Sequence, residues 1–279
     1  AEHWGVRVSG ATAVPALDLY QVADPAERLA RTTAYLEKLE AHVGGLAQFH
    51  EEHHAKGGNA SVHYAYDEKN CIANATDIML DQMMCSVPAQ QILADAGGGS
   101  TEARAERLLA SFDAMDQMME LFYQHKGLAD SFDAGTDAAV IKSNLLPSQH
   151  LNIRYTRMFA GAFMYAAGNH IGIEWGSVPG LAQGAPYVLD GDGARVSVSL
   201  FGWGIGHEIG HNINQAQYAY PEVTNNYFAQ LSQTDGTSAS ARFSYDEVYD
   251  RVTSGDEGRT GSVFTQLAMY WQLRLAYDA

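Results

Sequence analysis

The sequence has little positive charge and few cysteines. Its 279 residues include 17 Lys and Arg against 33 Asp and Glu, a formal net charge of −16. Because nucleic-acid binding requires a basic surface, this balance argues against a nucleic-acid partner. Two cysteines are too few for a small disulfide-bonded scaffold, and we expect Cys71 and Cys85 to be free, buried thiols.

Long apolar runs are also missing. No stretch approaches the roughly 18–20 apolar residues that cross a bilayer, so we expect no transmembrane segment. The first ten residues have neither the basic nor the apolar region of a signal peptide, and the chain begins with Ala1, so we expect a processed or excised piece. The 46% hydrophobic content is typical of a globular protein with one large domain or two lobes.

Hydrophobic periodicity changes along the chain from a mixed first half to a strand-rich middle and a helical end. Asp24 and Pro25 form an N-cap and a first helical position, which predicts a helix from there to about His54. Aspartates and glycines within the alternating stretch Tyr187–Leu200 predict a hairpin. The other expected elements are strands at Pro15–Val22, Ser61–Tyr66 and Leu151–Met158, and helices at Ser86–Ala96, Thr101–His125 and Ser262–Tyr277.

The segment from His207 to His211 reads HEIGH. Two histidines four positions apart project from one face of a helix, where they can bind one metal ion. Catalytic zinc takes three protein ligands and leaves the fourth position to water. Glu208 lies about 100° round the helix, so it can accept the proton of that water instead of binding the ion. Glycines at 202, 204, 206 and 210 predict close approach of another element to this helix.

The third ligand follows from what comes after the motif. The metzincin pattern needs a glycine and a histidine where the chain has Asn214 and Gln217, so that interpretation fails. The gluzincin pattern needs a glutamate on a following helix, and Glu222 meets this need. Asn225 and Asn226 fall on the same helical face as Glu222, where an amide oxygen can accept the free ring N–H of a ligand histidine.

A second HExxH occurs at His50–His54. Its intervening residues are Glu52 and His53, and it ends a charged helix before a lysine and two glycines. A metal-binding helix within a core needs apolar or small residues at these positions. We therefore interpret this segment as a solvated helix end.

The stretch GWGIGHEIGHNINQ followed by PEVTNNYF resembles the enhancin-like, mucin-degrading zinc metallopeptidases, a family of gluzincins. Segments 163–173 and 260–273 are similar to segments of the same family. The resemblance implies Zn²⁺ held by His207, His211 and Glu222, with Glu208 as general base. It also implies a thermolysin-like, two-lobed α+β zincin fold. We expect an α+β lobe over 1–200 and the metal helix with a helical lobe over 201–279, together one catalytic domain.

For many members, the family activity is hydrolysis of O-glycosylated, mucin-type proteins on the N-terminal side of the glycosylated Ser or Thr. The resemblance thus implies a secreted or extracellular peptidase, with cell-surface attachment through further modules. Two alternatives stay open: a zinc endopeptidase without a glycan requirement and a catalytically silent glycoprotein-binding module. Substrate contacts are expected at a sheet edge over Met164–Gly168 and at a sugar-stacking Trp203. The candidates are Ala166, Ala167, Gly168 and Trp203 for substrate, and Tyr245 and Tyr249 for stabilising the oxyanion.

Overall fold

The first helix, α1 (Pro25–His54), has the bounds that the sequence predicts. The Asp24 side chain accepts a hydrogen bond from the Ala26 N–H at 3.0 Å and so caps the first turn. An apolar stripe of α1 faces the core through Leu36, Leu39 and Leu46. The computed structural model describes residues 13–54, 66–69, 71, 73–158, 161–193, 195–196, 199–234, 239–255 and 262–277.

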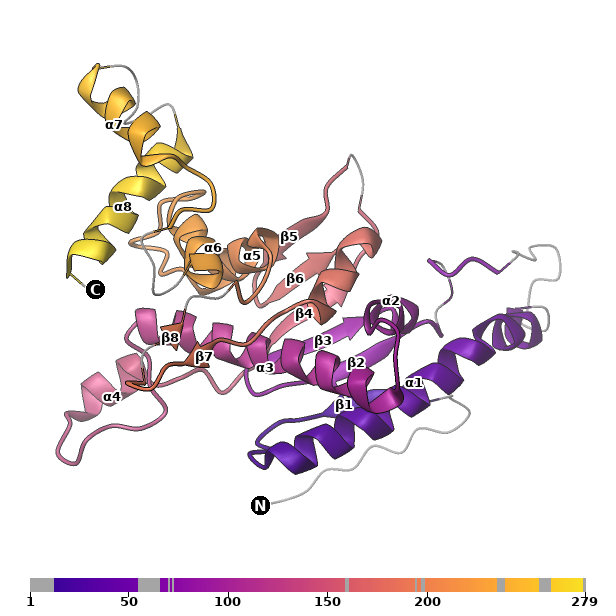
Figure 1. Cartoon of the computed structure of the whole chain (residues 1–279). Coiled ribbons are helices and arrows are strands. Elements are labelled where there is room, and N and C mark those ends of the chain that lie inside the picture. The colour runs from indigo at the N-terminus through magenta and orange to yellow at the C-terminus, as the bar shows by residue number, and fades with distance from the viewer. Residues whose placement is uncertain are drawn as a thin grey trace.

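A six-stranded mixed sheet forms the centre of the fold (Figure 1). Its order is β1-β2-β3-β4-β6-β5, with β5 on one edge. The pairs β2–β3 and β5–β6 are antiparallel, and the other three pairs are parallel. The strands are β1 (Ala16–Asp18), β2 (Thr76–Met79), β3 (Met83–Val87), β4 (Leu151–Tyr155), β5 (Met164–Ala167) and β6 (His170–Ile173).

Helices from the first half cover this sheet. The helix α3 (Thr101–His125) again has the predicted bounds, and it packs against α1 (Figure 1). The Ser100 hydroxyl caps α3 by accepting the Ala103 N–H at 3.2 Å. The predicted hairpin is present as two short strands, β7 (Val188–Leu189) and β8 (Arg195–Val196). The remaining elements before residue 200 are α2 (Ala89–Asp95), α4 (Ala138–Asn144) and a 3₁₀ helix, η1 (Trp175–Ala182).

The predicted helix over Ser86–Ala96 is wrong at its start. Ser86 and Val87 belong to β3, and α2 begins only at Ala89, after Pro88 at the N-cap. Val87 is buried and paired with β2, so its burial and ladder contacts fix the strand up to the proline. Most of the strand predicted over Ser61–Tyr66 lies outside the described residues.

The C-terminal part is helical among the described residues. The helix α5 (Trp203–Ile213) contacts β5 and β6 of the sheet and also packs against α6 (Thr224–Thr234). Helix α8 (Val263–Tyr277) packs on α6, and α7 (Tyr245–Thr253) packs on α8 (Figure 1). The predicted HExxH helix therefore lies between the sheet and the C-terminal helices.

Cys71 and Cys85 are free and buried, as predicted. Burial raises the pKa of the Cys85 thiol to about 12. Across the described part of the chain, no helix combines the length and the apolar character needed to span a membrane.

Candidate active site

Three of the four glycines predicted to allow close approach lie against neighbouring elements. A Cβ on Gly210 would lie 2.6 Å from the backbone oxygen of Asn225, and one on Gly206 would lie 2.9 Å from the Cα of Ala229. Both contacts are with α6. At Gly204 a Cβ would meet the Met164 sulfur of β5 at 3.1 Å, whereas Gly202 is the N-cap of α5. The glycines therefore let α6 pack closely against the helix that carries both histidines.

The structure brings His207, His211 and Glu222 together. Glu222 Oε1 lies 3.1 Å from His211 Nε2, and Glu222 Oε2 lies 3.4 Å from His207 Nε2. One ligand atom from each of the three residues falls within 4.8 Å of the others. Two atoms bound to one tetrahedral zinc at about 2.0–2.1 Å are about 3.4 Å apart. The two contacts of Glu222 match this separation, and imidazole nitrogens and carboxylate oxygens are ligand atoms that zinc accepts.

A hydrogen bond determines which ring nitrogen of His207 has a lone pair that can bind a metal ion. Asn226 Oδ1 lies 2.6 Å from His207 Nδ1, so the amide oxygen accepts the Nδ1–H and leaves Nε2 with its lone pair. His211 Nε2 lies 2.9 Å from the Asn225 amide nitrogen and 3.1 Å from Glu222 Oε1. The Nε2 atom of His207 therefore has the unprotonated form that a metal ligand needs.

Asn226 also connects the histidine to the backbone of Glu222. Its amide nitrogen donates to the Glu222 carbonyl at 2.5 Å, while its oxygen accepts from Trp203 Nε1 at 3.1 Å as well as from His207. The side chain is 3% exposed. One buried amide thus orients both the ring of His207 and the main chain of Glu222.

Glu222 is not on the helix predicted for it. The helix α6 begins at Thr224, and Glu222 lies in the preceding turn with φ of +63°, a left-handed conformation that non-glycine residues rarely adopt. Backbone bonds from Val223 and Thr224 to the Tyr220 carbonyl close this turn at 3.0 Å each. Such strained residues concentrate at functional sites, and here the turn directs the carboxylate toward the two histidines.

Glu208 is buried beside this cluster, with 8% of the residue exposed. Burial raises the pKa of its carboxyl group, the nearby His207 opposes the shift, and the negative charge of Glu222 adds to it. For His211, burial and the neighbouring His207 lower the pKa, against the raising effect of Glu222. A raised carboxyl pKa suits proton exchange near neutral pH, and a lowered imidazole pKa favours the neutral, metal-binding ring.

Trp203 lies at the start of α5 with its ring enclosed by two side chains. The Arg242 guanidinium lies 5.1 Å from the ring centroid, and Phe264 packs edge-on at 6.2 Å. Together with the bond to Asn226, these contacts describe a tryptophan that supports the histidine cluster. Stacking on a sugar, the role suggested by the sequence, stays a prediction.

The strand β5 is an outer strand of the sheet, as predicted, and it runs beside α5. Ala166 and Ala167 are in this strand, whereas Gly168 lies in the turn that follows, with φ of +58°. Sequence reasoning missed Asn212, whose amide nitrogen donates to the Gly168 carbonyl at 2.6 Å and to the His170 carbonyl at 3.3 Å. The residue next to His211 thus fastens the β5–β6 turn to α5, and no local pattern marks it.

The two tyrosines expected to stabilise an oxyanion lie on α7. The Tyr245 ring packs edge-on against Phe243 at 5.3 Å, and Tyr249 is 68% exposed among apolar residues of α7 and α8. Figure 1 shows α8 and α6 between α7 and the histidine-bearing α5. Stabilisation of an oxyanion by Tyr245 or Tyr249 stays a prediction.

The second HExxH segment has a different environment. His50 is 3% exposed and packs edge-on against Tyr66, whereas Glu51 and Glu52 are exposed at the end of α1. Among the described residues, the His207, His211 and Glu222 cluster is the group of three or more ligand side chains close enough to share one ion.

A metallopeptidase is the class of protein that this cluster and a mixed α+β fold indicate. Residues 193–279 match the family model described as "Peptidase M60, enhancin and enhancin-like". The resemblance to the enhancin-like peptidases is therefore confirmed, and residues 193–279 are similar to an M60 peptidase domain. No curated protein matches the sequence significantly.

Solved structures share the fold over nearly the whole chain. The ZmpB metallopeptidase from Clostridium perfringens is 19% identical, with a TM-score of 0.62 over 98% of this chain and 46% of that structure. The M60 catalytic domain of Clostridium perfringens ZmpC, in complex with the sialyl T antigen, is 17% identical, with a TM-score of 0.56 over 98% and 45%. A Bacteroides thetaiotaomicron metallopeptidase is 16% identical, with a TM-score of 0.51 over 98% and 37%. The chain spans less than half the length of these structures.

Proposed function

We propose that the chain is a secreted zinc endopeptidase that hydrolyses O-glycosylated, mucin-type proteins on the N-terminal side of a glycosylated Ser or Thr. The observation that carries the proposal is the cluster of His207, His211 and Glu222 beside a buried Glu208, within an M60 peptidase-like domain. Secretion and the preference for glycosylated substrates rest on the family resemblance. The two points agree with each other, because mucin-type glycoproteins are extracellular.

Zinc would be held by the three clustered side chains and would supply Lewis-acid chemistry, which makes a water molecule more acidic and polarises a carbonyl group. Glu208 accepts a proton from the attacking water and then donates it to the leaving amine. Its burial supports this role, because the raised pKa brings the two protonation states closer in free energy. Asn226 keeps the His207 ring in the required tautomer.

A peptide substrate fits along the outer edge of β5. Phe163 and Glu174 share a backbone hydrogen bond of 2.9 Å, and bonded residues alternate along an antiparallel pair. Met164 and Ala166 therefore direct their N–H and C=O groups away from β6, where an extended peptide can pair with them. Gly204 and Asn212 place the two ends of this strand against the two ends of α5.

A pocket of about 380 Å³ lies where β5 and α5 begin. Phe163, Phe201 and Ile205 supply apolar walls, while Ser177 and Gln183 supply polar groups. None of the lining side chains that the structure describes carries a charge. A neutral sugar such as N-acetylgalactosamine has matching apolar faces and hydroxyl groups, so this pocket supports a glycan next to the cleaved bond.

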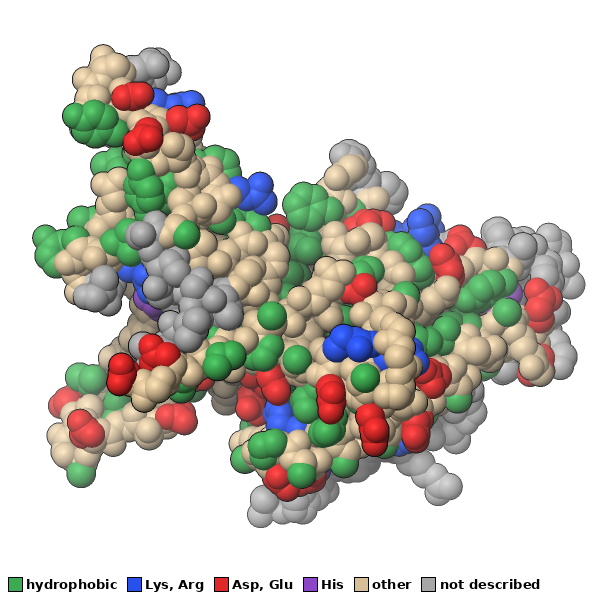
Figure 2. Space-filling view, viewed as in Figure 1, with side chains coloured by type: hydrophobic (Ala, Val, Ile, Leu, Met, Phe, Trp, Pro, Cys, Tyr) green, Lys and Arg blue, Asp and Glu red, His purple; other side chains and the backbone are tan. Residues whose placement is uncertain are grey.

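The proposal includes two lobes of one catalytic domain, 1–200 and 201–279, arranged as in a thermolysin-like zincin. The position of α5, with the sheet on one side and α6 on the other, supports this division. Figure 2 shows a notch between the C-terminal helices and the β5–β6 end of the sheet, which suits a cleft between lobes.

Paired substrates test the function. A peptide carrying a single O-linked N-acetylgalactosamine and its unglycosylated twin are incubated with the protein, with and without a chelator, and the products are analysed by mass spectrometry. We expect chelator-sensitive cleavage before the modified residue and at least about 100-fold slower cleavage of the bare peptide, because the groups that contact the sugar lose their partner. Equal rates would leave a general endopeptidase, and binding without cleavage would leave a glycoprotein-binding module.

A further inference from the structure

A second pocket, of about 330 Å³, lies beneath the loop that joins α5 to α6. We call it the tyrosine pocket, because three tyrosines and a phenylalanine are among the residues that line it. The Tyr227 hydroxyl lies 3.4 Å from His125 Nδ1, and the Tyr227 ring packs edge-on against Trp271 at 5.7 Å. These contacts hold one wall in place. The residues used below are Lys126, Asn214, Gln215, Tyr218, Tyr227 and Tyr270.

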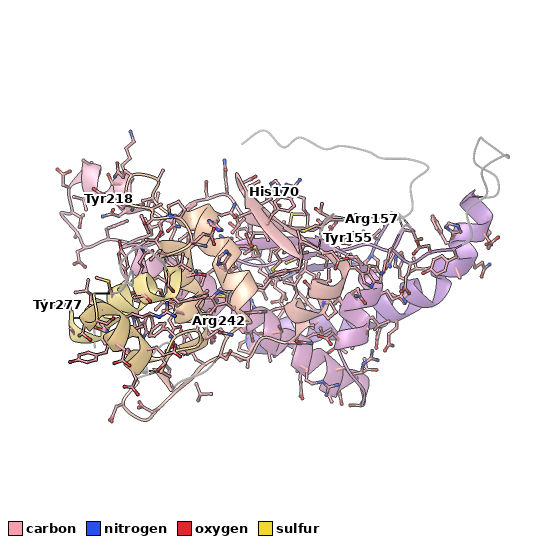
Figure 3. All side chains as sticks on the ribbon, turned by 90° about the horizontal axis from the view of Figure 1, so that it is seen from above. Tyr155, Arg157, His170, Tyr218, Arg242 and Tyr277 are labelled. Atoms are coloured by element: carbon pink, nitrogen blue, oxygen red, sulfur yellow. The ribbon has the colours of Figure 1, made fainter. Side chains whose placement is uncertain are left out.

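The tyrosine pocket is separate from the histidine cluster. On α5 it uses Ile213, which is two positions beyond His211 and therefore about 200° round the helix. On α6 it uses a face formed by residues 224, 227 and 228, whereas the asparagines that contact the histidines are Asn225 and Asn226. Figure 3 shows Tyr218 well apart from His170 and Arg242, which mark the β5–β6 turn and the start of α5.

The charge of this pocket differs from that of the molecule. The chain has a net charge of −16, yet the described residues that line the tyrosine pocket include Lys126 and no aspartate or glutamate. Within the described part of the chain, Lys126 forms no ion pair with a carboxylate. Burial lowers the pKa of its ammonium group, because the group is partly desolvated without a compensating negative charge. A half-buried cation without a partner among polar aromatic rings suits an anionic ligand.

We propose that the tyrosine pocket binds a carboxylate-bearing sugar such as sialic acid. The tyrosine rings present flat apolar surfaces to the C–H faces of the sugar, and their hydroxyl groups meet its polar edge. The Asn214 and Gln215 amides supply donors and acceptors for ring hydroxyls and the N-acetyl group. The Lys126 ammonium pairs with the carboxylate. If the peptidase proposal also holds, this pocket retains sialylated chains of the substrate at a distance from the cleaved bond.

The test measures binding of free N-acetylneuraminic acid to the full chain by saturation-transfer NMR and calorimetry, with galactose as the neutral sugar and an acidic peptide as a second anion. A monosaccharide has no peptide bond, so the result is independent of whether the chain is a peptidase. We expect N-acetylneuraminic acid to bind and galactose and the peptide to bind at least about tenfold more weakly.

Two variants assign the site. Lys126→Gln and Tyr218→Ala should each weaken binding of N-acetylneuraminic acid about tenfold or more, and Tyr218 is 73% exposed, so its replacement leaves the core intact. Lys142→Gln, an equal charge change at an exposed position of α4, should have no effect. No binding, equal binding of galactose, stronger binding of the peptide, or equal losses in Lys126→Gln and Lys142→Gln would each overturn the proposal.

Discussion

Two segments of this chain have the same HExxH pattern and different surroundings. At the end of α1, Glu51 and Glu52 are exposed and His50 packs against an aromatic ring. In α5, Glu208 is buried, and His207 and His211 meet a carboxylate from a turn that follows. The pattern sets only the spacing of two histidines. A third ligand, a tautomer-fixing amide and a buried base depend on what packs against the helix.

The largest difference between the two motifs should appear when the glutamate next to the first histidine of each is neutralised. Glu208→Gln should lower kcat by about 100- to 10,000-fold while zinc content is unchanged, because an amide cannot accept the proton of water and the ligands remain. Glu51→Gln should cleave the glycopeptide at the wild-type rate. Turnover and metal content are measured on the same samples. Half of the wild-type turnover in Glu208→Gln would refute its role as general base.

Removal of Glu222, the proposed third ligand, should distinguish the two segments by its effect on the metal content. Glu222→Ala should reduce bound zinc from about one per chain to well below that, because two histidines alone make an incomplete site. The matched change Glu51→Ala should retain the metal. Inductively coupled plasma mass spectrometry after dialysis gives the number of zinc ions bound per chain. Full occupancy in Glu222→Ala, or the same loss in both variants, would contradict the assignment.

A buried carboxylate outside the cluster tests whether burial alone indicates function. Burial raises the pKa of Asp116 from its ordinary 3.8 to about 6, Asp81 adds to the shift, and Arg28 opposes it. The folded state therefore binds more protons than the unfolded state between these values, so stability falls as pH rises from about 4 to 6. Roughly two pKa units correspond to about 2–3 kcal/mol.

Asp116→Asn should remove most of this slope and leave peptidase activity intact. Asp113 is the more exposed of the two carboxylates that pair with Arg28. Asp113→Asn should therefore leave the dependence of stability on pH unchanged. Chemical unfolding at several pH values measures both. A slope that persists in Asp116→Asn would assign the titration to another group.

Local signals explain which parts of the fold could be predicted. The bounds of α1 and α3 follow from caps and from apolar periodicity, which act within one turn of helix. The wrong start of α2 came from a strand and a helix that meet at Pro88. For the candidate site, spacing predicted the three clustered side chains. The left-handed turn at Glu222 and the bonds of Asn212 to the β5–β6 turn depend on contacts between elements, so the sequence did not predict them.

The smallest effect is expected from a Gly→Ala substitution, which adds one methyl group, in each of the two HExxH helices, α1 and α5. In α1, a Cβ on Gly44 would meet nothing within 4 Å, so Gly44→Ala should stabilise the fold by about 0.5–1 kcal/mol through helix propensity. In α5, a Cβ on Gly210 would lie 2.6 Å from α6 backbone, so Gly210→Ala should force the helices apart and destabilise by about 1–3 kcal/mol despite the same gain in propensity. Denaturant unfolding measures the free energies, and zinc content should fall only in Gly210→Ala, because the shift separates Glu222 from the histidines. Stabilisation by both substitutions would mean that the close contact between α5 and α6 is not what holds the cluster together.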